Sequence, residues 1–327
     1  MSQTTKKKVL LIAPLYHGYY LKLKSAFEKE GYDVILFSEQ PNDFFSTNFY
    51  FSKIKKIKYF WKSYQQKIKE VNNRILKTTH EVDLEYIVVI KGDLLTHEFY
   101  QQLKSSHSKS KMILYQWDSL ISFNYLDIVK YFDKVYSFDS LDSKTYEFIN
   151  YLPLFYSDEY EKLGFENKIS YKYDVFFLGV NHSIRLGLLK EMMDVFEKNK
   201  LKYTINLMTD LTQKLKMVLS STKINTFLTS RSFKKFADDY LRSKAILDIT
   251  SPIQTGLPIR IIEAIGANKK IITTNYNIIN ESFYNQNLVF LWGRDDLNSL
   301  PEFLNKTHNK IDSRIYSINS FVRRLIS

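Results

Sequence analysis

Cysteine is absent from this 327-residue sequence. A chain without cysteine forms no disulfide bonds and supplies no thiolate ligands to a metal. Small secreted proteins held together by disulfides are therefore excluded as a class. The composition permits a reducing compartment without requiring one.

Long apolar runs are absent as well, and none approaches the roughly 20 residues that a transmembrane helix needs. Near the N-terminus, the apolar run from Val9 to Leu15 is short and contains Pro14. It is better interpreted as a first buried strand than as a signal sequence. The sequence thus favours a protein that is soluble or attached to a membrane surface.

Motifs for metal ions and common cofactors are also missing. No Asp-x-Asp triplet follows an apolar strand, and the six histidines are scattered without the i, i+4 spacing of a helical zinc site. Neither the dinucleotide fingerprint G-x-G-x-x-G nor a Walker loop is present. We therefore expect no metal ion and no bound cofactor.

Acidic residues are missing between Asp43 and Glu70, although the whole chain carries a net charge of +12. This segment alternates lysines with apolar and aromatic residues at near-helical spacing: Lys53, Ile54, Lys55, Lys56, Ile57, Lys58, Trp61, Lys62, Tyr64, Lys67, Ile68 and Lys69. A basic amphipathic helix of this kind suits the headgroup layer of an anionic membrane. The alternative is a solvated lysine face on a helix whose apolar stripe packs on the core.

The length of the chain favours two domains that each bury their own core. Apolar, β-branched runs alternate with helical patterns, which is typical of α/β doubly wound parallel sheets. We expect strands at Val9–Ala13, Asp33–Ser38, Tyr86–Ile90, Lys111–Gln116, Lys134–Phe138, Asp174–Gly179, Ala245–Thr250 and Lys269–Thr274. A helix is expected near Leu126–Tyr131. We place an N-terminal domain at residues 1–155 and a C-terminal domain at 170–327, whose last helix packs back on the first.

The segment from Lys244 to Asn275 predicts a strand, a turn, a short helix and a second strand. Gly256 and Leu257 precede Pro258, where the first helical turn tolerates a missing N–H. Arg260 and Glu263 then share one face of the helix. A helix start suits a phosphate, and a carboxylate one turn later can accept hydrogen bonds from a ribose diol. These features suggest a nucleotide site.

The stretch GLPIRIIEAIGANKKIITTN resembles the donor-site segment of GT-B glycosyltransferases, especially bacterial enzymes of capsule and lipopolysaccharide assembly. The resemblance implies two Rossmann-like domains facing across a cleft, with Glu263 on the ribose of a nucleotide sugar and Arg185 against its diphosphate. Gly256, Leu257, Pro258 and Arg260 belong to the same donor-binding segment. Many retaining members carry a second Glu where this chain has Thr255, which puts retaining chemistry in doubt.

Polar residues follow the predicted strands of the first half, at the edge where open α/β sheets bind ligands. Sugar transfer needs a base for the acceptor hydroxyl. We predict Asp118 as that base, Asp93 as the second candidate and His17 as the third, with Lys91 and Trp117 contacting the acceptor. The alternatives are an Asx turn or helix cap for Asp118, a local hydrogen bond for His17 and a solvated loop position for Lys91.

The resemblance implies metal-independent transfer from a nucleotide sugar to a surface-glycan or lipid-linked acceptor, in the cytoplasm or at the inner face of its membrane. Two other classes stay open. Net charge and 16% aromatic residues suit a nucleic-acid-binding protein, although no recognised binding motif accompanies them, and we expect no nucleic-acid partner. A noncatalytic glycan-assembly protein on the same scaffold is the other.

Overall fold

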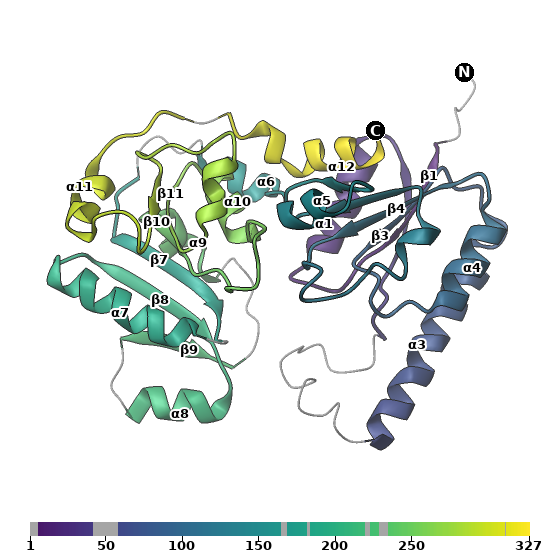
Figure 1. Cartoon of the computed structure of the whole chain (residues 1–327), viewed down its shortest axis with the longest axis horizontal. Helices are drawn as coiled ribbons and strands as arrows, with labels where there is room; N and C mark the ends of the chain where they lie inside the picture. The colour runs from purple at the N-terminus through teal and green to yellow at the C-terminus, as the bar shows by residue number, and fades with distance from the viewer. Residues whose placement is uncertain are drawn as a thin grey trace. The chain divides into compact units, whose positions relative to one another are not determined.

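The computed structural model describes residues 6–41, 58–164, 169–181, 184–219, 223–228, 235–310 and 312–327. The chain divides into two compact units, one of Met1–Pro153 together with Ile318–Ser327 and the other of Leu154–Ser317 (Figure 1). The first unit therefore contains both the start and the end of the chain.

The first unit is built on a six-stranded parallel sheet with the order β2-β1-β3-β4-β5-β6. Its strands are β1 Lys8–Ile12, β2 Asp33–Phe37, β3 Tyr86–Ile90, β4 Lys111–Gln116, β5 Lys134–Ser137 and β6 Ile149–Tyr151. The order reverses between β1 and β3, because β2 lies on one side of β1 and all later strands lie on the other.

Helices cover both faces of this sheet (Figure 1). They are α1 Tyr19–Lys29, α3 Lys58–Thr79, α4 His97–Ser106, α5 Ser140–Thr145 and α12 Ile318–Ile326. Helices α3 and α4 pack on the face that contains Leu10 and Ile87. On the other face α12 packs beside α1, and the ring of Phe321 meets that of Tyr115 at 4.7 Å. The sheet is therefore buried on both sides, as parallel sheets are.

Helix α3 carries the C-terminal part of the lysine-rich segment. Lys53, Lys55 and Lys56 lie outside the described residues, and side chains are described from Tyr64 onward. From there a stripe at helical spacing is buried: Tyr64, Ile68, Val71 and Ile75. Lys69 lies exposed on the other side. In this part of the helix the apolar face packs on the core, as the second alternative predicted. No helix in the described ranges is long and apolar enough to cross a bilayer.

The second unit has its own six-stranded parallel sheet, in the order β12-β11-β10-β7-β8-β9. Its strands are β7 Tyr173–Val180, β8 Tyr203–Met208, β9 Ile224–Phe227, β10 Ser243–Asp248, β11 Lys270–Thr273 and β12 Val289–Leu291. Its helices include α6 Asp158–Gly164, α7 Arg185–Lys198, α8 Leu211–Leu219, α9 Ala237–Leu241, α10 Ile259–Gly266 and α11 Leu300–Asn305. Here the order reverses between β7 and β10.

The predicted α/β fold class is confirmed, since both units are doubly wound parallel sheets. One predicted element is wrong in type. In place of a helix near Leu126–Tyr131, the chain forms a single 3-10 turn at Val129–Tyr131. Asn124 and Asp127 favour local turns over a continuous helix, and the Asn124 side chain accepts a hydrogen bond from the Leu126 N–H.

Helix α10 approaches a buried tyrosine so closely that only glycine fits at the contact. A Cβ on Gly266 would lie 2.4 Å from Cγ of the Tyr156 ring, which is fully buried. Such a distance is far below van der Waals contact, and a buried ring has little room to move. Gly266 therefore sets how deeply α10 packs in the second unit.

We predict that Gly266→Ala lowers the free energy of unfolding by about 1–3 kcal/mol through overpacking, although alanine is the better helix former. Gly187→Ala in α7 is the matched control, because a Cβ there meets no atom within 4 Å. That change should raise stability by up to about 1 kcal/mol. Denaturant unfolding measures both, and a stabilising Gly266→Ala would contradict the packing argument.

Candidate functional site

Three of the predicted residues meet at the carboxyl ends of β3 and β4 in the first unit. The Lys91 ammonium lies 3.1 Å from Oδ2 of Asp93 and 3.1 Å from Oδ2 of Asp118. All three side chains are partly exposed. The structure thus brings together both leading base candidates around one cation, which the sequence did not predict.

The backbone that carries Lys91 is held in an uncommon conformation. Lys91 has a φ of 71° and Gly92 a φ of 75°, both in the left-handed region. The Lys91 carbonyl accepts a 2.6 Å hydrogen bond from Nε2 of the buried Gln116, and the Gly92 carbonyl accepts one from the Tyr100 hydroxyl at 3.0 Å. A lysine in this region costs on the order of 1 kcal/mol, and such strain concentrates at functional sites.

The charge of Lys91 is fixed by its neighbours. Desolvation lowers the pKa of Lys91, but the carboxylates of Asp118 and Asp93 outweigh it and hold that pKa above its usual value. Lys91 is therefore a permanent cation at physiological pH. It keeps two nearby carboxylates together without the repulsion that they would otherwise feel.

Aromatic rings gather beside this cluster. The rings of Tyr16 and Trp117 lie 5.9 Å apart at a tilted angle, and His17 meets Tyr16 edge-on at 4.3 Å. Desolvation lowers the pKa of His17, so its ring is neutral near pH 7. Trp117 is thus part of a ring group at the ends of β1 and β4, to which Tyr16 belongs although the sequence did not single it out.

In the second unit, Arg260 binds a carboxylate that the sequence analysis missed. Its Nη1 lies 2.6 Å from Oδ1 of Asp248, whose side chain is 1% exposed, and its Nε donates to the Leu178 carbonyl at 2.9 Å. Asp248 also accepts hydrogen bonds from the hydroxyls of Thr250 and Thr273. The signal for Asp248 was present, since it is the acidic residue that ends an apolar strand.

Arg185 is buried rather than open to a ligand. Its Nη1 donates to the Val180 carbonyl at 2.6 Å and its Nη2 to the Ile249 carbonyl at 2.7 Å, so it bridges the ends of β7 and β10. Both Arg185 and Arg260 lie over the ring of Phe177, at 5.9 and 5.3 Å. Arg185 thus braces the point where the strand order reverses, and its contact with a diphosphate stays a prediction.

The start of α10 is fixed from the neighbouring strand. Asn275, which follows β11, donates from Nδ2 to the Gly256 carbonyl at 3.1 Å. Leu257 is buried, and Pro258 sits at the N-cap with φ −65°. Helix α10 begins at Ile259, as the position of the proline predicted.

Glu263 is almost completely buried, at 7% exposure. It lies near the buried hydroxyl of Tyr240. Burial raises the pKa of that hydroxyl, and the charge of Glu263 raises it further. A carboxylate kept at so little exposure is costly unless it has partners. Its role toward a ribose stays a prediction.

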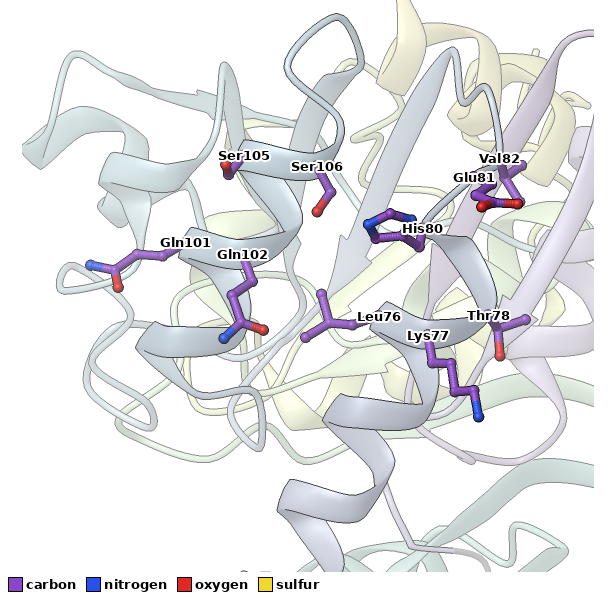
Figure 2. Close-up of a pocket in the computed structure, with 10 residues that line it drawn as sticks. All are labelled: Leu76, Lys77, Thr78, His80, Glu81, Val82, Gln101, Gln102, Ser105 and Ser106. Atoms are coloured by element: carbon purple, nitrogen blue, oxygen red, sulfur yellow. The ribbon is translucent and has the colours of Figure 1, made fainter.

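A surface hollow of about 930 Å³ in the first unit belongs to a different place (Figure 2). It lies between the end of α3 and α4 and is lined by Leu76, Lys77, Thr78, His80, Glu81, Val82, Gln101, Gln102, Ser105 and Ser106. None of these residues belongs to the Lys91 cluster. Within the described ranges, no three His, Asp or Glu side chains are placed to hold a metal ion.

The contribution of the pair between Arg260 and the buried Asp248 to the free energy of unfolding can be tested directly. We predict that Arg260→Met lowers the free energy of unfolding by about 3–5 kcal/mol, because it leaves the Asp248 charge buried without its cation. Arg314→Met is the control, since Arg314 and Asp312 pair at the same 2.6 Å but are 82% and 60% exposed. That change should cost at most about 1 kcal/mol.

A double variant sharpens the test by chemical denaturation. Adding Asp248→Asn to Arg260→Met should restore part of the lost stability, because the unpaired charge is then removed. Equal losses for Arg260→Met and Arg314→Met would show that the pair of Arg260 with Asp248 contributes no more to stability than an exposed pair.

The chain resembles known proteins in its fold. No model of a known protein family matches the chain, and no curated protein sequence matches it significantly. Several solved structures match it over nearly their full length. The glycosyltransferase AviGT4, involved in avilamycin A biosynthesis, shares 9% identity at a TM-score of 0.60, over 98% of this chain and 96% of that one.

Two further structures show the range of activities on this fold. The lipopolysaccharide outer core galactosyltransferase WaaB, in its apo form, gives a TM-score of 0.56 at 10% identity, over 98% of this chain and 99% of that one. The UDP-GlcNAc 2-epimerase of Methanocaldococcus jannaschii, in complex with UDP-GlcNAc and UDP, gives 0.53 at 12% identity, again over 98% and 99%.

At such low identities the likeness establishes architecture and leaves the reaction to the residues of the site. The matches cover 98% of this chain and so span both six-stranded parallel sheets. The protein therefore has the two-domain α/β fold of the GT-B glycosyltransferases.

Proposed function

We propose that this protein is a glycosyltransferase that moves a sugar from a nucleotide-sugar donor to a glycan or lipid-linked acceptor, without a metal ion. The observation that carries the proposal is the corner from Gly256 to Glu263, where a helix start follows the carboxyl end of β10 at the reversal of strand order. Open α/β sheets bind nucleotides at such points. The solved epimerase with this fold holds UDP-GlcNAc and UDP.

In the proposed reaction, the second unit binds the donor and the first supplies the base. Glu263 accepts hydrogen bonds from the ribose, and the first turn of α10 favours the charge of the diphosphate. Asp118 takes the proton of the acceptor hydroxyl while the oxygen of that hydroxyl forms a bond to the anomeric carbon of the donor sugar. At the same time, the bond between the anomeric carbon and the diphosphate oxygen breaks. Lys91 holds Asp118 in place for this step through their 3.1 Å ion pair.

In this proposal the aromatic rings around Trp117 bind the acceptor sugar. A sugar ring presents apolar C–H faces, and Trp117 with Tyr16 offers an aromatic surface beside Asp118. WaaB acts on the lipopolysaccharide outer core, and a surface glycan is the acceptor class that we propose here by analogy. Because the described apolar stripe of α3 faces the core, the lysine segment from Lys53 to Lys69 would bring the enzyme to an anionic membrane at the inner face by charge alone, which co-sedimentation with anionic vesicles can test.

We predict that a panel of nucleotide sugars, read by thermal shift, contains at least one that raises the melting temperature, since a ligand of the folded state adds RT ln(1 + [L]/Kd). Glu263→Gln should weaken that ligand about 10- to 100-fold, because a charge-assisted hydrogen bond contributes roughly 1.5–3 kcal/mol. Glu302→Gln on α11 is the control at an exposed position and should bind normally. Unchanged affinity in Glu263→Gln would remove the ribose assignment.

Transfer itself is tested at the base. With the donor found, Asp118→Asn should lower kcat by about 10²–10⁴-fold while donor affinity stays within about twofold. The reaction is followed with and without a chelator, and by product analysis that separates transfer from epimerisation and hydrolysis. A near-normal rate in Asp118→Asn would eliminate it as the base and leave Asp93 as the candidate.

A further inference from the structure

A further carboxyl group lies near the end of β2, since Glu39 is two residues beyond Phe37, the last residue of that strand. Glu39 is fully buried at 0% exposure. Its Oε2 accepts a long hydrogen bond of 3.4 Å from the Leu94 N–H. Its Oε1 receives no hydrogen bond from any residue that the structure describes. A buried carboxyl in this position is far too costly to keep as an isolated anion.

The titratable groups that interact with Glu39 include members of the Lys91 cluster and of helices α3 and α4. Asp93 and Lys91 come from the turn after β3, Tyr64 from α3 and Tyr100 from α4. Tyr100 hydrogen-bonds the Gly92 carbonyl. The ammonium of Lys91 is already placed between Asp93 and Asp118 at 3.1 Å from each.

The contact between Glu39 and Asp93 joins two groups that only accept hydrogen bonds when ionised. Such a contact is attractive only if one of the two carries a proton, as in other buried carboxyl pairs. Burial raises the pKa of Glu39 first, and the charge of Asp93 raises it further against the smaller opposing effect of Lys91. Asp93 is partly exposed and bonded to Lys91, so Glu39 is the member that holds the proton.

We propose that Glu39 is a positioning residue, a neutral carboxylic acid that donates to Asp93 and thereby holds the Lys91 ammonium against Asp118. The inference rests on the proposed function for its consequence in transfer, and on the geometry of the first unit for everything else. It also separates the two candidate bases. Asp93 accepts from Glu39 and Lys91, whereas Asp118 is held by Lys91 alone among the described residues and is 38% exposed.

The first test needs no substrate. A group whose pKa is raised by folding contributes stability that is complete below its unfolded pKa and is lost as pH rises toward its folded one. Wild-type stability should therefore fall, relative to Glu39→Gln, from about pH 4.5 upward. The difference in melting temperature should grow by roughly 3–5 °C per pH unit. Glu70→Gln on the exposed side of α3 is the control and should show a flat difference.

A flat difference for Glu39→Gln would show that Glu39 is ionised in the folded protein and would overturn the proposal. Crystal structures of two variants then test the positioning. Glu39→Gln keeps a neutral donor toward Asp93, so the contact of Lys91 with Asp118 should remain near 3.1 Å. Glu39→Leu removes the donor, and Lys91 should leave Asp118. An unchanged Lys91 in Glu39→Leu would also overturn the proposal.

Transfer kinetics of the Glu39 variants test the effect of this residue on the reaction. Failure of this inference can be distinguished from failure of the proposed function. Glu39→Leu should lower kcat at least tenfold with the KM for donor unchanged, and Glu39→Gln should rescue most of that loss. If no transfer is found with any donor, the proposed function fails, while the melting and crystallographic results still decide the role of Glu39. A kcat in Glu39→Leu as high as in Glu39→Gln would contradict a role for the proton.

Discussion

Burial of both sheets on both faces is the constraint from which the rest of this structure follows. A parallel strand covered by helices has no solvent for a polar side chain along its length, so charged groups collect where the strands end. In each unit the order of strands reverses once, between β1 and β3 and between β7 and β10. The crossover helices then leave in opposite directions, and the loops at that point are the ones with room for chemistry.

The two units use this edge in different ways. In the second, two arginines are held by partners within the unit. Arg185 ties together the ends of β7 and β10, Arg260 pairs with Asp248, and both guanidinium groups lie over the ring of Phe177. Gly179 leaves the space that Arg260 and the Phe177 ring occupy. These ionic contacts give a rigid edge from which α10 starts, so the donor end of the proposed reaction is built on a preformed frame.

In the first unit, the ionisable groups at the strand ends include a carboxyl group that holds a proton. One ammonium and three carboxyl groups share a small volume, which requires that a proton be kept among them. In this proposal burial assigns that proton to Glu39, the left-handed turn at Lys91 and Gly92 places the ammonium, and Asp118 stays the most exposed of the paired carboxylates. An electrostatic site of this kind needs little rearrangement during a reaction.

The sequence by itself determined the alternation of strands and helices, the start of α10 at Pro258 and the polar strand ends, because apolar periodicity and backbone restrictions act over a few residues. Only the tertiary structure decided that Arg260 pairs with Asp248 twelve positions away, that Glu263 is buried, that the apolar stripe of α3 faces the core and that Glu39 meets Asp93. Partners, burial and protonation depend on which strands become neighbours, and a parallel sheet makes neighbours of residues far apart in the chain.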